Sequence, residues 1–148
     1  MKSVIVVRNF VAILFSLAVL VATPAARADE SNQATKITFS QPVQIPGRVL
    51  PAGTYWFELP EDIGEHSLVR IYSADRSVLY ATLLAPNSER ATGTDHTVFG
   101  LAERGSAQPQ AIVTWFYPGE TTGHQFLYPK QVEKEIASVK LVNVMAGK

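Results

Sequence analysis

The chain contains no cysteine among its 148 residues. Disulfide bonds, thiol catalysis, thiolate metal sites and lipid attachment through a cysteine are therefore excluded. The chain also has no excess of basic residues, because 13 lysines and arginines are balanced by 13 aspartates and glutamates. A nucleic-acid partner requires a basic surface that displaces counterions, so we expect no nucleic-acid binding.

The chain has no apolar run long enough to span a membrane. Its longest run, Phe10–Ala22, covers 13 residues, whereas a spanning helix needs about 20. Lys2 and Arg8 precede this run, and Ala26-Arg27-Ala28 follows it with the small-x-small pattern of a signal peptidase site. Together these are the three parts of a secretory signal. We expect residues 1–28 to be a cleaved signal peptide, and the protein to be exported to the periplasm or the exterior.

A retained membrane anchor is the alternative to cleavage. Extending the apolar run backwards would bury Arg8 and Asn9 in lipid, which is costly. Cleavage after Ala28 removes three basic residues and no acidic residue, which leaves 10 basic and 13 acidic side chains. The resulting net charge of −3 disfavours electrostatic binding to anionic lipid. We therefore expect no stable membrane span after cleavage.

Short extended runs separated by proline and glycine make up the rest of the chain. Residues 29–34 are polar and predict a flexible leader. Alternation of apolar and polar residues, or enrichment in β-branched and aromatic residues, predicts the following strands: 35–39, 54–59, 66–73, 78–85, 96–103, 110–117 and 124–128. The pair 66–73 and 78–85 predicts a β-hairpin. Ile45–Arg48 and Tyr117–Glu120 fit type II turns, and the polar segment 86–95 predicts a surface loop.

The C-terminal tail is ambiguous between helix and strand. Val132, Ile136 and Val139 have the spacing of one face of an amphipathic helix, whereas the segment 138–144 is rich in β-branched residues. We predict a short helix near 130–137 and a strand after it. The whole pattern predicts an all-β fold, a single antiparallel β-sandwich or small barrel of about seven to nine short strands over residues 35–148.

Three stretches of the sequence resemble a known group of proteins: Leu50–Tyr55 (LPAGTY), Trp115–Gly119 (WFYPG) and Phe126–Lys130 (FLYPK). The likeness is to small exported β-domain proteins of unknown function from soil bacteria such as the acidobacteria. It covers roughly residues 35–130. The resemblance implies an exported β domain and implies no activity or binding residues.

The three histidines, His66, His96 and His124, are the candidate metal ligands. Zinc requires three or four ligands brought together. The spacings of 30 and 28 residues form no local motif, but each histidine lies at the predicted start of a strand. If these starts share one end of the sandwich, the histidines converge with Glu65, Asp95 or Glu120. No cofactor is expected otherwise.

Two other arrangements bear on catalysis. Asp95 precedes His96 directly, but neighbours in a strand point to opposite faces, so we expect Asp95 not to orient His96 as a triad acid would. Acidic residues around the predicted bend 61–65 (Glu58, Glu61, Asp62 and Glu65) are candidates for a carboxylate pair of a hydrolase. A solvated turn explains the same residues more simply, and no catalytic residue is assigned.

Trp56 is the candidate ligand-binding residue. Alternation places Tyr55, Phe57 and Leu59 on one face of a strand and Trp56 on the other, with Thr54 and Glu58. A tryptophan on a polar face is suited to stack on a sugar ring or to anchor a partner; core packing is the alternative, and Trp115 is expected in the core.

Three hypotheses for function follow. The first is a non-catalytic binding module of the cell envelope or exterior, whose partner is a glycan, an envelope component or a protein. The second is a structural accessory subunit of an envelope assembly. The third is a metal- or carboxylate-dependent hydrolase, which is disfavoured because no catalytic pair forms a local motif.

Overall fold

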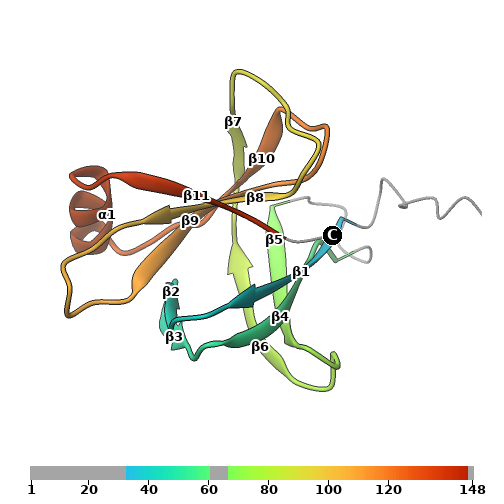
Figure 1. Cartoon of the computed structure of the whole chain (residues 1–148), viewed down its shortest axis with the longest axis horizontal. Helices are drawn as coiled ribbons and strands as arrows, with labels where there is room; N and C mark the ends of the chain where they lie inside the picture. The colour runs from blue at the N-terminus through green and yellow to red at the C-terminus, as the bar shows by residue number, and fades with distance from the viewer. Residues whose placement is uncertain (1–32, 61–66, 147–148) are drawn as a thin grey trace, which may run out of the picture.

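The computed structural model describes residues 33–60 and 67–146. These residues form eleven β-strands and one α-helix, arranged as two sheets packed face to face. Figure 1 shows the helix at one end of the second sheet. The predicted signal peptide, residues 1–28, lies outside the described residues. No helix among the described residues is both long and apolar enough to cross a membrane.

The first sheet is antiparallel and contains strands β1 (Ala34–Phe39), β4 (Gly53–Glu58), β5 (Leu68–Ser73) and β6 (Leu79–Leu84), in that order. Every second side chain of β1, β4 and β5 is buried, which is the pattern of a sheet with one face on the core. The predicted hairpin of β5 and β6 is confirmed.

The second sheet has the order β11 (Leu141–Met145), β8 (Val98–Ala102), β9 (Gln110–Phe116), β10 (Thr122–Gln125) and β7 (Asn87–Glu89). The short strand β2 (Val43–Ile45) lies parallel to the start of β9 and also forms a hairpin with β3 (Arg48–Leu50). Strand β9 is buried on both faces, as its continuous apolar centre predicts.

Aromatic side chains fill the space between the two sheets. The ring of Phe57, from the first sheet, lies 5.0 Å from that of Phe99 and 6.2 Å from those of Trp115 and Phe126, all measured between centroids. Phe57 and Trp115 are fully buried. Each aromatic side chain buries about 150–250 Å², so this cluster stabilises the packing of one sheet on the other.

Glycine permits the two predicted type II turns. Gly47 and Gly119 have φ of +82° and +80°, a conformation that glycine adopts without steric cost. Each follows a proline that fixes the preceding φ. The amide of Glu120 donates to the carbonyl oxygen of Tyr117 at 3.3 Å and so closes the second turn.

The structure corrects several details of the predicted sandwich. Its described residues form eleven strands rather than about seven to nine, because the chain also forms the three-residue strands β2, β3 and β7. Strand β7 lies inside the predicted loop 86–95. The pairing of β2 with β9 is parallel, so the fold is not purely antiparallel. The two sheets are open rather than closed into a barrel within the described residues.

Element boundaries differ from the prediction at both ends of the domain. Strand β1 begins at Ala34, and the carbonyl of Gln33 accepts a hydrogen bond from Leu59, so the predicted leader 29–34 is wrong for these two residues. Strand β10 ends at Gln125, whereas the prediction extended it to Tyr128. The tail is helix α1 (Lys130–Ala137) followed by β11, which confirms the predicted order.

Candidate functional site

A hollow of about 280 Å³ lies where the start of β1 meets the segments before β8 and after β9. We call it the Trp56 hollow. It brings together two residues that the sequence analysis singled out separately, Trp56 and His96. Its described lining is Ala34, Thr35, Lys36, Trp56, Asp95, His96, Thr97, Tyr117, Pro118 and Ala146.

Trp56 faces outward because of the alternation of β4. Tyr55 and Phe57 are buried in the core, whereas Trp56 lies between them on the opposite face and is partly exposed. The sheet register places Lys36 of β1 on one side of Trp56 and Tyr72 of β5 on the other. The predicted face of Trp56 is therefore confirmed.

The turn between β5 and β6 holds the indole ring in place. Trp56 Nε1 donates a hydrogen bond of 3.1 Å to the carbonyl oxygen of Ala74. The guanidinium carbon of Arg76 lies 4.0 Å from the ring centroid, and Arg76 Nε is 2.7 Å from Glu58 Oε1. The ammonium nitrogen of Lys36 is 5.8 Å from the same centroid. These cations attract the electron-rich face of the indole, which fixes its orientation.

Asp75 stabilises the conformation of that same turn. Its Oδ1 accepts hydrogen bonds from the hydroxyl groups of Ser73 and Ser77, at 2.6 and 2.8 Å, and from the Ser77 amide at 3.1 Å. These bonds favour the ionised carboxylate and lower the pKa of Asp75 to about 2. The turn also places Arg76 at a φ of +60°.

Asp95 and His96 are in contact, contrary to the prediction from strand geometry. Asp95 Oδ1 lies 3.1 Å from His96 Nε2. The two residues occupy a bend, and β8 begins only at Val98, so the strict alternation of a strand does not apply to them. The side chain of Asp95 is 86% exposed and that of His96 is 37% exposed.

Two buried threonines connect the hollow to the core. The hydroxyl groups of Thr35 and Thr97 lie 3.4 Å apart, and the Trp115 indole N–H donates to Thr35 Oγ1 at 3.2 Å. Both threonines are buried. Their hydroxyl groups are therefore engaged within the protein.

His124, another predicted histidine ligand, does not line this hollow. His124 lies inside β10, not at its start, and is buried. Its ring packs on Trp115 with 5.5 Å between centroids, and its Nδ1 lies 3.2 Å from the carbonyl oxygen of Ala85. His66 lies outside the described residues. Within 33–60 and 67–146, no three histidine, aspartate or glutamate side chains are placed to hold a metal ion.

Of the four acidic residues considered as a carboxylate pair, the structure describes only Glu58, which forms an ion pair with Arg76. Glu61, Asp62 and Glu65 lie outside the described residues. Sequence reasoning missed Lys36 and Arg76 as neighbours of the indole, and Tyr117 as a residue of the same hollow. The alternation of β1 gives Lys36 the outward orientation of Trp56, but no local pattern reveals the other two.

Comparison of the chain with protein-family models, curated proteins and solved structures finds no match. The resemblance to exported bacterial β-domain proteins therefore stays a prediction. The fold and the geometry of the hollow carry the functional argument.

Proposed function

We propose that this protein is an exported, non-catalytic binding module of the cell envelope or exterior, and that the Trp56 hollow binds a sugar residue of an envelope glycan. The observation that carries the proposal is the convergence of Trp56 and His96 in one hollow. In this hollow, residues that are distant in the sequence provide an aromatic surface together with several polar groups.

The chemistry of the hollow suits a sugar ring. Trp56 and Tyr117 offer apolar surfaces for the C–H faces of the ring, while Asp95 and His96 offer hydrogen-bonding groups for its hydroxyls. Lys36 makes no ion pair within the described residues, which favours a sugar that carries a carboxylate.

The indole is already oriented before a ligand arrives. Its N–H is bonded to Ala74 and its ring is stacked by Arg76. Pre-orientation lowers the entropy that binding must overcome, because the side chain has little rotamer freedom left to lose. This rigidity supports a binding role.

The geometry gives less support to catalysis. The Asp95 carboxylate lies largely in solvent and His96 is partly exposed, so water screens the interaction between the two groups. The threonine hydroxyls of the hollow are engaged with each other and with Trp115. Asp95 is the only carboxylate that lines the hollow among the described residues, so the described lining offers no pair of carboxylates for a hydrolase.

Fluorescence titration tests the proposal. The protein is titrated with oligogalacturonate and with the disaccharide of N-acetylglucosamine and N-acetylmuramic acid. We expect saturable binding that changes the Trp56 emission and weakens as salt is added. Trp56→Ala should weaken affinity about tenfold or more.

Tyr72→Ala is the matched control, since Tyr72 lies beside Trp56 on the same sheet face but does not line the hollow. Its affinity should stay near that of the wild type. Equal losses in the two variants, or binding unchanged in Trp56→Ala, would refute the assignment of the site.

An accessory role in an envelope assembly is the second candidate. Strands β6 and β11 are at the edges of their sheets and expose apolar side chains: Leu79, Leu84, Leu141 and Met145. Such edges accept an added strand from a partner. Cross-linking in intact cells, with photoreactive groups at Leu84 and Leu141, tests this role; absence of any cross-linked species would count against it.

A further inference from the structure

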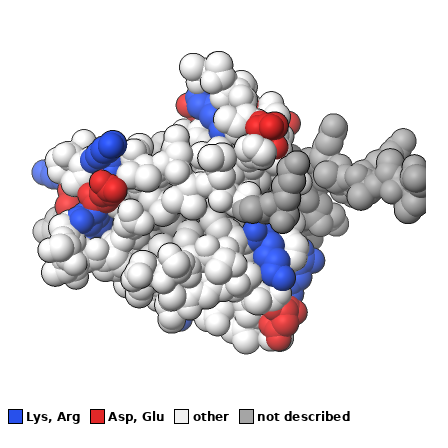
Figure 2. Space-filling view, in the orientation of Figure 1, with Lys and Arg blue, Asp and Glu red and all other residues white. Residues whose placement is uncertain are grey.

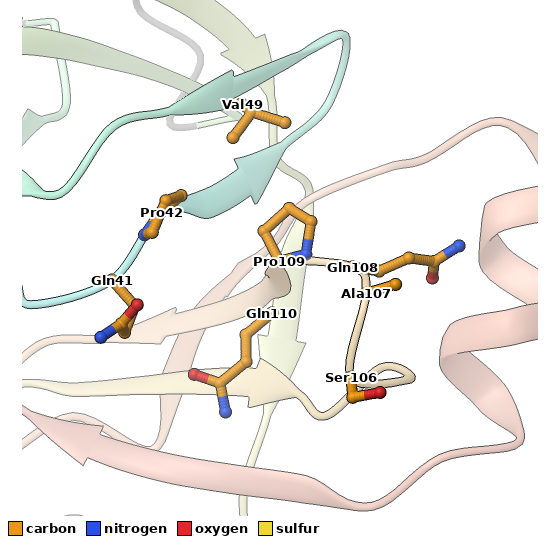
Figure 3. Close-up of a pocket in the computed structure, with 8 residues that line it drawn as sticks. All are labelled: Gln41, Pro42, Val49, Ser106, Ala107, Gln108, Pro109 and Gln110. Atoms are coloured by element: carbon orange, nitrogen blue, oxygen red, sulfur yellow. The ribbon is translucent and has the colours of Figure 1, made fainter.

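A second hollow lies at the base of hairpin β2–β3, beyond the opposite end of β1 from the Trp56 hollow. It has a volume of about 510 Å³, within the range of about 300–1,000 Å³ typical of small-molecule sites. Figure 3 shows Pro42 and Val49 on the side of the hairpin and Pro109 facing them from the segment before β9. We call it the glutamine hollow.

The parallel register of β2 and β9 builds this hollow. Val43 pairs with Gln110 and Gln44 with Ala111. Two Gln-Pro dipeptides, 41–42 and 108–109, directly precede these two pairs. Proline has no N–H, so the ladder of hydrogen bonds stops there and the chains separate.

Three amide side chains line the hollow without protein partners. Within the described residues, the side-chain amides of Gln41, Gln108 and Gln110 make no hydrogen bond to the protein. Each amide offers both donors and acceptors. In Figure 3 the amides of Gln41 and Gln110 lie on one side of Pro109, and that of Gln108 on the other.

No charged side chain belongs to the described lining of this hollow. An ionised ligand would therefore find no opposite charge in this lining. An uncharged ligand rich in hydroxyl groups would find donors and acceptors in the amides and in the Ser106 hydroxyl, and apolar surfaces on the two proline rings. We infer that the glutamine hollow binds neutral sugar residues of a glycan, as a second site with ligand chemistry different from that of the Trp56 hollow.

Isothermal titration with neutral oligosaccharides tests this inference. The probes are cellohexaose, maltohexaose and chitohexaose. We expect saturable binding of at least one of them, with an affinity that stays constant between low and high salt because no charge is involved. The double variant Gln41→Ala/Gln110→Ala should weaken that affinity about tenfold or more.

Gln131→Ala, an exposed glutamine of α1 outside the hollow, is the matched control and should bind as the wild type does. Trp56→Ala should also retain neutral-sugar binding, which separates this inference from the proposed function. Absence of saturable binding by all three probes would overturn the inference. So would binding that survives the double variant, or that Trp56→Ala abolishes.

Discussion

Gly123 in β10 leaves no room for a side chain, because the neighbouring strand β9 lies directly against it. A Cβ atom there would lie 2.5 Å from the carbonyl oxygen of Trp115 and would also press on the Phe116 ring. The obstructing oxygen belongs to the backbone of β9, which is held by pairing on both sides. The strand therefore has little freedom to move away.

We expect Gly123→Ala to lower the free energy of unfolding by about 1–3 kcal/mol, the usual cost of overpacking. Gly105→Ala is the control, because a Cβ at Gly105 meets nothing within 4 Å. Its effect should stay within about 0.5 kcal/mol. Urea denaturation of the two variants measures both values, and equal effects would contradict the steric argument.

Asp75 gives the turn that supports Trp56 a dependence on pH. Its pKa is about 2 in the folded protein, against an ordinary value of 3.8. Because the folded pKa is the lower one, the stabilising contribution is present above about pH 4 and is lost as the pH falls toward 2. Removing the carboxylate removes this dependence.

We therefore expect the melting temperature of Asp75→Ala to lie furthest below that of the wild type at about pH 5, and to approach it as the pH falls to about 2. Thermal melts followed by circular dichroism at several pH values make the comparison. A difference that stays constant over this range would show that the hydrogen bonds from Ser73 and Ser77 do not favour the ionised form.

At the scale of elements, Tyr128 joins the segment before α1 to two strands. Its hydroxyl lies 2.9 Å from the carbonyl oxygen of Gln44 in β2 and 2.7 Å from that of Ile112 in β9. Burial raises the pKa of this phenol above its ordinary value, so it remains a donor. The contact lies beside the short parallel pairing that also builds the glutamine hollow.

Tyr128→Phe should destabilise the protein by about 1–3 kcal/mol, since buried carbonyl groups lose a donor. Tyr72→Phe, on the outer face of the first sheet, should change stability by less than about 0.5 kcal/mol. Guanidinium titrations of both variants provide the test. A loss for Tyr72→Phe as large as that for Tyr128→Phe would contradict the assigned role of the buried hydroxyl.

The sequence predicts those elements whose pattern is local. Alternation predicts β1 and β4 and the outward face of Trp56, and the spacing of Val132, Ile136 and Val139 predicts α1. Three-residue strands such as β7 escape prediction because a partner strand stabilises them more than their own residue types do. The placement of Trp56 and His96 in one hollow escapes it too, since residues brought together from distant parts of the chain leave no local pattern.

At the scale of the whole molecule, Figure 2 shows charged side chains gathered in a few separate groups on this face, one of them beside α1, with a broad uncharged area between them.

One aromatic core serves both sheets. Phe57 of the first sheet contacts Phe99 and Trp115 of the second, and these two rings stack on each other. Neither sheet keeps its buried face covered if the other unfolds.

We expect the two sheets to unfold in a single cooperative transition. Trp56→Phe leaves Trp115, which is fully buried, as the only tryptophan of the chain. The emission of Trp115 and the far-ultraviolet circular dichroism of this variant should give the same denaturation midpoint. Separate midpoints would mean that one sheet survives without the other.

The parallel pairing of β2 with β9 has a consequence for the order of events during synthesis. Strand β2 is complete after residue 45 and pairs with β3 directly after it, but its parallel partner β9 begins only at Gln110. The hydrogen bond from the Trp115 indole to the Thr35 hydroxyl also forms only after residue 115 has been made. A growing chain can therefore pair β1 with β4 and β2 with β3 early, but it completes the packing of the first sheet on the second only after β9 has been made.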